Sequence, residues 1–186
     1  MMYRIAHHAG IRPLDPRRTA CHRRLALTVA ATALLLFPVA HRPALRLMWN
    51  ASASVPVGLY RIAPGHTARV GELVAVRPSP ALESFMAERR YVERHVPLLK
   101  PVAAIAGATV CRIGLRVTID GRAIATALPR DRFGRPLPRW QGCRRLGADE
   151  LFLIAPDSAA SFDSRYFGPV TRDRVIGRAS PVWTWR

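Results

Sequence analysis

The longest uninterrupted apolar segment of the chain runs from Leu25 to Ala40, 16 residues without a charged side chain. A helix of that length rises roughly 24 Å at ~1.5 Å per residue, slightly less than the ~30 Å hydrocarbon layer of a bilayer. Arginines flank the segment on both sides, with side chains long enough to reach the headgroups, and apolar residues resume as far as Met48. The pattern therefore predicts a transmembrane anchor over residues 25–48.

Two other interpretations of the same segment stay open, a cleaved signal peptide and a buried core helix. The anchor is favoured because apolar residues continue beyond the run. Arginines 17, 18, 23 and 24 lie before it, whereas arginines 42 and 46 follow it and dilute the asymmetry. The positive-inside rule then predicts a cytoplasmic tail (1–24) and a periplasmic domain (49–186), in a single-pass protein of a bacterial inner membrane.

From residue 50 onward, short runs of aliphatic and β-branched residues alternate with Pro and Gly turn signals, which is typical of strands. Asp120-Gly121 joins two alternating arms and predicts a β-hairpin. Only residues 80–96 show apolar positions at helical spacing. We therefore expect a mostly β fold, a compact domain with one short helix. The predicted strand segments are GLYRIA (58–63), ELVAVRP (72–78), TVCRIGLRVTIDGRAI (109–124), ELFLIAP (150–156) and RVIGRASPVW (174–183).

The chain is strongly basic, with 29 Lys+Arg against 12 Asp+Glu and a formal net charge of +17. Such a charge suggests nucleic acid or an anionic membrane as a neighbour. The arginines are scattered, however, and are not gathered in a stripe with aromatic residues between them. We therefore expect no nucleic-acid partner. Only one of the 29 is a lysine, Lys100, so most of the charge reflects an arginine bias of the composition.

The three cysteines, Cys21, Cys111 and Cys143, lack the CxxC and Cys/His spacings of a zinc site. We expect no metal and no cofactor. Cys111 and Cys143 form a disulfide if the later part of the chain faces an oxidising compartment. Two separately buried thiols are the alternative, and the sequence does not separate the two.

A nucleophilic serine needs a partner that takes its proton, either a histidine with a carboxylate or a neutral lysine. Only His66 and His95 lie beyond the expected anchor, and neither belongs to a recognisable triad motif. Lys100 lies in the apolar segment VPLLKPVAAIAG, and burial there would lower the pKa of its amine from ~10.4. Taken alone, this segment favours an ordinary lysine that reaches water from the end of a strand over a buried catalytic lysine.

Four motifs occur along the chain in the order ASVPVGLY, LLKPVAAIAG, SFDSRYFGPV and GRASPVW. In this combination they resemble the serine/lysine signal peptidases, and most closely the TraF-type peptidases of conjugative transfer. Each motif alone is weak, and the specificity lies in the set. The resemblance covers essentially the whole chain and implies a signal-peptidase-like β domain behind an N-terminal anchor.

The resemblance also implies roles for individual residues. Ser54 corresponds to the nucleophile and Lys100 to the general base. Ser52 corresponds to a serine that helps the amide of the nucleophile form the oxyanion hole. Ser161 corresponds to a serine that holds the lysine amine in place, and Asp163 to an aspartate needed for activity in the TraF type.

Further expectations concern the surroundings of these residues. Asp163 is expected to pair with Arg165 or with nearby backbone rather than to abstract a proton, and Val55 and Pro56 to form part of shallow substrate pockets. The chain departs from typical signal peptidases after the lysine, where it lacks the Arg-Val pair and the Leu-Pro-Gly-Asp turn. It also lacks their large second domain, as suits the compact conjugative type.

Together these features predict a membrane-anchored serine endopeptidase that cleaves an exported pilin precursor after small residues, in conjugation or type IV secretion. Whether the product is linear or cyclic stays open. The expected partners are the pilin precursor or another exported preprotein, and the inner membrane. The alternatives are a general type I signal (leader) peptidase, a non-catalytic pilus-assembly scaffold and a DNA-binding transfer component.

Overall fold

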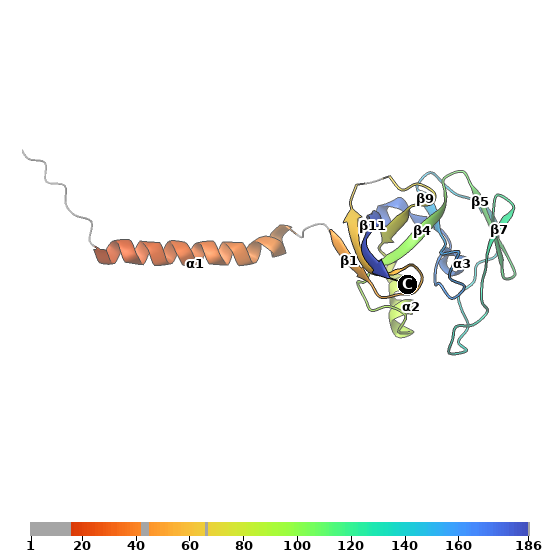
Figure 1. Ribbon diagram of the computed structural model, residues 1–186, viewed down its shortest axis with the longest axis horizontal. Helices are drawn as coiled ribbons and strands as arrows, with labels where there is room; N and C mark the ends of the chain where they lie inside the picture. Colours follow the sequence, from red (N-terminus) through yellow and green to blue (C-terminus); the bar gives the residue numbers. More distant parts are fainter. Residues whose placement is uncertain (1–15, 42–44, 66, 186) are drawn as a thin grey trace, which may run out of the picture. The chain divides into compact units, whose positions relative to one another are not determined.

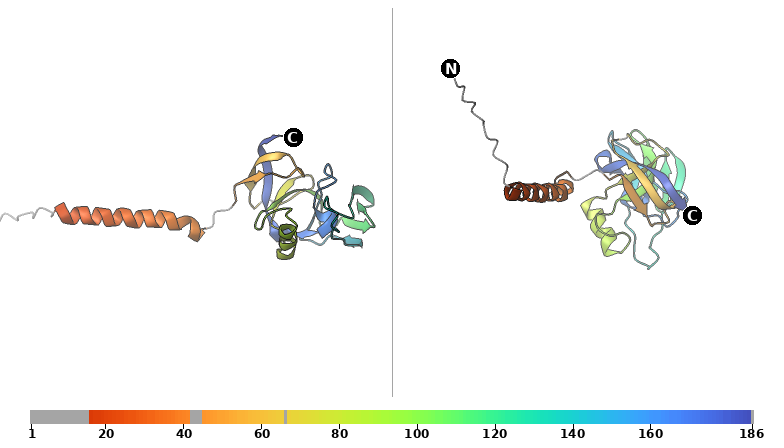
Figure 2. Two further views of the ribbon diagram at one scale, coloured as in Figure 1. Left: turned by 90° about the horizontal axis from the view of Figure 1, so that it is seen from below. Right: turned by 60° about the vertical axis from the view of Figure 1, so that its left-hand side comes forward.

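The computed structural model describes residues 16–41, 45–65 and 67–185. Residues 1–15 of the expected tail and 42–44 of the expected anchor lie outside this range. The chain divides into two compact units, of which the first ends at residue 44 and the second begins at Leu45. Helix α1 belongs to the first unit, and the strands and remaining helices belong to the second (Figures 1 and 2).

Helix α1 (Pro16–His41) contains the apolar run that predicted an anchor, but it begins well before that run. Among the helices of the described residues, none is long and apolar enough to cross a membrane. The expected segment 25–48 also extends past the helix, because Leu47 and Met48 lie in strand β1 (Leu47–Asn50). Met48 is buried in the core of the second unit, so its apolar character serves that core.

The larger sheet of the second unit has seven strands, and every neighbouring pair is antiparallel. Strand β11 pairs with β2 on one side and with β3 on the other, and β4 continues the sheet from β3 to β9. The order is β1, β2 (Val57–Ala63), β11 (Val175–Trp185), β3 (Leu73–Val76), β4 (Leu98–Ile105), β9 (Glu150–Leu153) and β10 (Val170–Thr171).

A second, four-stranded sheet lies beside the first (Figure 2). The turn between its strands β6 and β7 is the expected hairpin, and both Asp120 and Gly121 have the positive φ that a tight hairpin turn requires, 47° and 80°. The order is β7 (Arg122–Thr126), β6 (Arg116–Ile119), β5 (Thr109–Ile113) and β8 (Gly142–Arg145).

Strand β3 shows how the core is divided, because its two faces are both buried. Ala75 belongs to one hydrophobic cluster, and Val74 and Val76 belong to another, as the alternation of side chains along a strand requires. A third cluster lies where the two sheets meet and includes Val110 and Phe152. The apolar run of β3 is therefore continuous because neither face is exposed to water.

Two short helices complete the second unit, which is mostly β as expected. Ser79 is the N-cap of helix α2 (Pro80–Glu88), and its hydroxyl accepts a hydrogen bond from the backbone N–H of Leu82. The expected extension to residue 96 was wrong, because Arg90 adopts a left-handed φ of 56° that a helix cannot continue through. The sequence pattern also missed helix α3 (Ser164–Phe167) and a 3-10 turn, Arg172–Arg174.

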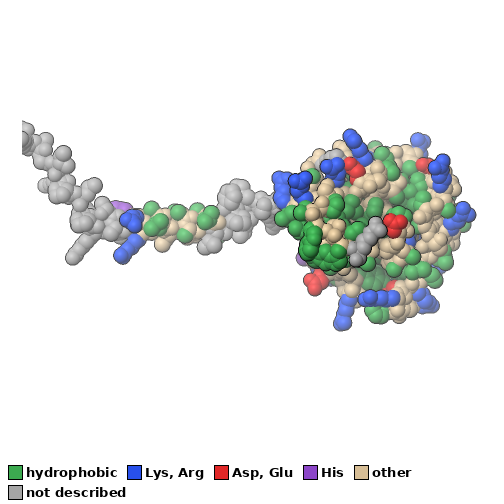
Figure 3. Space-filling view, in the orientation of Figure 1, with side chains coloured by type: hydrophobic (Ala, Val, Ile, Leu, Met, Phe, Trp, Pro, Cys, Tyr) green, Lys and Arg blue, Asp and Glu red, His purple; other side chains and the backbone are tan. Residues whose placement is uncertain are grey.

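The basic side chains of the second unit are spread over the face visible in Figure 3 and do not form a single stripe on it. Acidic side chains lie between some of them. Several form ion pairs, such as Arg135 with Asp131 at 2.7 Å and Arg144 with Glu150 at 2.6 Å. On this face the basic side chains are thus scattered, as they are along the sequence.

Candidate active site

The first motif, residues 53–60, begins in the loop between β1 and β2 and continues into β2. The buried side chain of Asn50 organises this loop. Its Nδ2 donates hydrogen bonds to the carbonyl oxygens of Ser52, Val55 and Pro56, at 2.9, 3.1 and 3.0 Å. Its Oδ1 accepts hydrogen bonds from the backbone N–H and the hydroxyl of Ser52, at 3.1 and 3.0 Å. One side-chain amide therefore fixes the backbone on both sides of Ser54.

Ser54 is half-buried, and its hydroxyl oxygen lies 3.0 Å from that of Ser52. Gly58 is the second residue of β2 and has a φ of 146°. A Cβ atom at this position would lie 2.1 Å from the carbonyl oxygen of Trp183 on β11. No other residue fits this close approach without moving the backbone. The glycine of the motif is thus required by strand packing, whereas the small residues before it leave the serine hydroxyls accessible.

Lys100 lies on β4 and is only 5% exposed. Its Nζ donates a 2.9 Å hydrogen bond to Oγ of Ser161, which is also buried. Burial lowers the pKa of Lys100 from its ordinary 10.5 to about 8, while the Asp163 charge raises this pKa and the Arg165 charge lowers it, both more weakly than burial acts. Much of the amine is therefore unprotonated near pH 8 and is able to accept a proton.

Asp163 is fully buried and forms an ion pair with buried Arg165, with 2.8 Å between Oδ1 and Nε. The carboxylate also accepts hydrogen bonds from the backbone N–H groups of Ala155 and Arg165, at 3.0 and 3.2 Å, and caps helix α3. The Arg165 guanidinium donates in turn to the Ala155 carbonyl at 2.9 Å. With these partners Asp163 holds in place the segment that carries Ser161.

The serine loop and the lysine strand share one part of the core. Val55, which is half-buried, packs against the hydrophobic cluster that contains Leu99, the neighbour of Lys100, whereas Pro56 is exposed. No hydrogen bond joins Ser54 to Lys100 in the described part of the chain; the two side chains bond instead to Ser52 and Ser161. Catalytic hydrogen bonds often shorten only in the complex with substrate.

The two remaining expectations concern cysteines and metals. Cys111 and Cys143 are directly opposed in the register of β5 and β8, and a disulfide joins them. Of the two interpretations that the sequence left open, the structure has the paired one. Among the described residues, no three His, Cys, Asp or Glu side chains form a group that could hold a metal ion.

Sequence reasoning missed Asn50, although it makes more contacts to the serine loop than any other side chain described above. Its partners are mostly backbone atoms, which leave no trace in the sequence. The only available signal was an asparagine directly before a loop of small residues, which is also an ordinary turn signal.

Comparison with known families fits this arrangement. A family model described as signal peptidase, peptidase S26, matches residues 20–185. The chain therefore belongs to the S26 family of signal peptidases.

Within that family, the chain is similar to proteins of plasmid and conjugal transfer. A plasmid transfer protein TraF from Escherichia coli is 32% identical over 145 residues, covering 73% of this chain and 82% of the relative. A probable conjugal transfer protein TraF from Sinorhizobium fredii is 37% identical over 149 residues, covering 73% and 76%. A signal peptidase I from Leptolyngbya laminosa is 27% identical over 112 residues, covering 60% and 50%.

The lowered pKa of Lys100 is directly testable because this is the only lysine in the chain. Labelling lysine Cε with 13C gives a single side-chain NMR signal, and we expect it to titrate with a midpoint of about 8. Arg61→Lys supplies an internal control, since residue 61 is exposed and its lysine should titrate near 10.5. Two signals that titrate together near the ordinary value would contradict the buried amine.

Asn50→Asp should loosen the serine loop, because it replaces the donating Nδ2 with an oxygen that faces three carbonyl groups. We expect a loss of about 1–3 kcal/mol in the free energy of unfolding, measured by urea denaturation, and faster exchange of the Ser52 backbone N–H. Gln141→Glu makes the same chemical change at an exposed amide and serves as the control. Equal stability of the two variants would argue against the role of Asn50.

Proposed function

We propose that this protein is a serine endopeptidase with a Ser/Lys dyad, Ser54 and Lys100, that processes an exported pilin precursor in a conjugation or type IV secretion system. The observation that carries the proposal is the buried amine of Lys100, the only lysine in the chain. A peptidase of this class needs a base that is unprotonated near neutral pH, and burial supplies one.

In the proposed mechanism, Lys100 takes the proton of the Ser54 hydroxyl as the oxygen attacks the scissile carbonyl, and then returns it to the leaving amine. The Ser54 N–H and the Ser52 hydroxyl stabilise the oxyanion. Ser161 holds the lysine amine in its orientation, as its 2.9 Å hydrogen bond suggests. The resulting acyl-enzyme is resolved by water, giving a linear product, or by an amine of the substrate, giving a ring.

The position of the serine loop supports binding of an extended peptide. Strand β1, which leads into the loop, is at one edge of the seven-stranded sheet. An extended substrate would add to this sheet as a further strand, a common mode of peptide recognition. Small side chains of the substrate would then enter shallow pockets near Val55 and Pro56, one half-buried and the other exposed.

The choice of substrate rests on the relatives. Those named for plasmid or conjugal transfer are at least 32% identical in the two cases above and match 73% of the chain. A conjugation system exports a pilin, which makes the pilin precursor the proposed substrate. A general leader peptidase is the second candidate, and the similarity to a signal peptidase I favours it more weakly.

We also propose that the chain is anchored in the inner membrane with the second unit in the periplasm. Three features support this location: the uncharged run within α1, the arginines before it, and the disulfide between Cys111 and Cys143. Disulfides persist in the periplasm and are rare in the cytosol, where thiols are kept reduced.

Processing is tested by co-expressing the protein with a pilin gene from the same conjugation system and measuring the pilin mass. Wild type should shorten the precursor, and Ser54→Ala and Lys100→Met should leave it intact, since loss of nucleophile or base lowers kcat by about 10³-fold or more. Ser84→Ala, a serine on α2, should behave as wild type. A ring product would lack the mass of one water relative to the linear product.

The pH dependence of the same reaction identifies the base. Lys100 is protonated below its pKa of about 8 and cannot then accept a proton, so kcat/KM should fall about tenfold per pH unit below that value and level off above it. A pilin shortened equally by wild type and Ser54→Ala, or a rate that rises as pH falls, would contradict the proposed dyad.

The location is tested by thiol modification. Cells are quenched with acid, and the denatured protein is treated with a maleimide-polymer reagent without reductant. The full chain should gain one polymer, on Cys21, because Cys111 and Cys143 are paired. A chain lacking residues 1–41 should stay in the cytosol and gain two. Three polymers on the full chain would exclude an oxidised second unit.

A further inference from the structure

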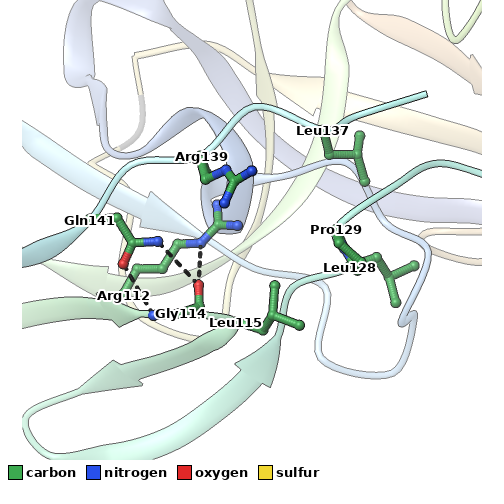
Figure 4. A pocket seen from close by; sticks show the side chains of 8 residues that line it. All are labelled: Arg112, Gly114, Leu115, Leu128, Pro129, Leu137, Arg139 and Gln141. Carbon is green, nitrogen blue, oxygen red and sulfur yellow. Dashed lines mark hydrogen bonds between the residues drawn. The ribbon is translucent and has the colours of Figure 1, made fainter. Parts of the chain in front are cut away.

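A small pocket in the second unit lies apart from the residues of the candidate active site. It has a volume of about 180 Å³ and lies between strand β5, the turn after it and the long loop that precedes β8. Figure 4 shows the side chains that line it. They are Arg112, Gly114, Leu115, Leu128, Pro129, Leu137, Arg139 and Gln141.

Arg112 forms the floor of this pocket and is only 1% exposed. Its Nε donates to the carbonyl of Gly114 at 3.3 Å, and its Nη1 donates to the carbonyls of Pro138 and Arg165 at 3.2 and 2.5 Å. Among the described residues, Nη2 of Arg112 donates no hydrogen bond to the protein. Every fully buried side-chain nitrogen in this part of the chain has a hydrogen-bond partner. Nη2 is therefore not fully enclosed, and because Arg112 lines the pocket, we infer that its hydrogens are available to a ligand there.

Arg139 adds a second positive charge at the same place. Figure 4 shows its guanidinium group beside that of Arg112. Burial lowers the pKa of Arg112, and the charge of Arg139 lowers it further by a smaller amount. Arg139 is exposed. No carboxylate of the described residues forms an ion pair with either guanidinium. Two like charges thus lie together with no anion from the protein to balance them.

The remaining walls of the pocket are largely apolar. Leu115 and Leu128 are 43% and 39% exposed at its rim, and Leu137 is half-buried. A ligand that balances the two arginines and also covers these leucines must have an anionic end and an aliphatic body. The planar fork of a guanidinium matches a carboxylate with two parallel hydrogen bonds.

We propose that this pocket binds a carboxylate carried on a short branched aliphatic group, such as the C-terminal residue of a peptide. The carboxylate receives hydrogen bonds from Arg112 Nη2 and from the Arg139 guanidinium, and the aliphatic group lies against Leu115, Leu128 and Leu137. Inorganic phosphate shares the charge but would leave the leucines uncovered. The proposal does not depend on the catalytic role of Ser54 or Lys100.

The test is an NMR titration of the full chain in detergent micelles, followed through the backbone N–H of Gly114, which donates to the pocket residue Gln141. The probes are 4-methylpentanoate, an acetylated dipeptide ending in leucine, the amide of that dipeptide, and inorganic phosphate. We expect saturable shifts with both carboxylates and at least tenfold weaker binding of the amide and of phosphate. The tighter of the two carboxylates identifies the source, free acid or peptide end.

Arg139→Gln is the matched variant, because Arg139 is exposed, whereas Arg112 also holds the backbone of Arg165 and its loss would disturb folding. We expect Arg139→Gln to weaken carboxylate binding at least tenfold. Arg122→Gln, which makes the same charge change on β7 outside the pocket, should leave it unchanged. Equal binding of dipeptide and amide, equal binding of phosphate, equal effects of the two variants, or no saturable shift at all would overturn the proposal.

Discussion

The burial of one amine is the constraint on which the rest of the candidate site depends. An ammonium group loses most of its hydration when it is enclosed, so burial favours the neutral form of Lys100 and lowers its pKa to about 8. The neutral amine has a lone pair to accept a proton and hydrogens to donate. Its bond to Ser161 uses a hydrogen and leaves the lone pair available, so the same enclosure would supply both the base of the proposed mechanism and its orientation.

The buried ion pair of Asp163 and Arg165 also acts on Lys100, and the amine stays neutral only if this pair does not raise its pKa again. An unpaired Asp163 carboxylate would favour the ammonium form and keep the proton on Lys100. Arg165 has the opposite influence, and the two charges act on the lysine pKa in opposite directions. The pair therefore secures the backbone around Ser161 through several hydrogen bonds while adding little net charge to the surroundings of the amine. A lone carboxylate could not do both.

The sequence predicted those parts of the molecule that depend on local pattern. Alternating apolar residues and the Asp120-Gly121 turn located the hairpin and most of the strands, but the predicted segments did not include β4 or the two-residue β10. Strand β1 was hidden because Met48 continues the apolar run of the preceding helix, and β8 was hidden because its segment, GCRR, has no apolar alternation and is exposed. Both segments are strands because of the neighbours with which they pair in the folded chain, and the local sequence does not show those neighbours.

The site residues were predictable only as a set of motifs. The sequence around Lys100 fitted an ordinary strand-end lysine, and its burial and its contact with Ser161 come from residues far along the chain. The resemblance to signal peptidases supplied the pairing that local sequence could not. The resemblance did not point to Asn50, which acts through hydrogen bonds to the backbone of the loop and to Ser52.

The contacts of Asn50 also bear on how the serine hydroxyls must be arranged for the proposed attack. The Ser52 hydroxyl has one hydrogen, and either Asn50 Oδ1 or Ser54 Oγ is placed to accept it, each at 3.0 Å. While that hydrogen points to Asn50, only Ser54 can donate along the Ser52–Ser54 contact, so its proton points to Ser52. In the proposed mechanism the Ser54 proton turns toward Lys100, and the Ser52 hydrogen turns from Asn50 Oδ1 toward the oxyanion. The proposed mechanism therefore needs only the rotation of two hydroxyl groups in this loop, whose backbone is held by the amide of Asn50.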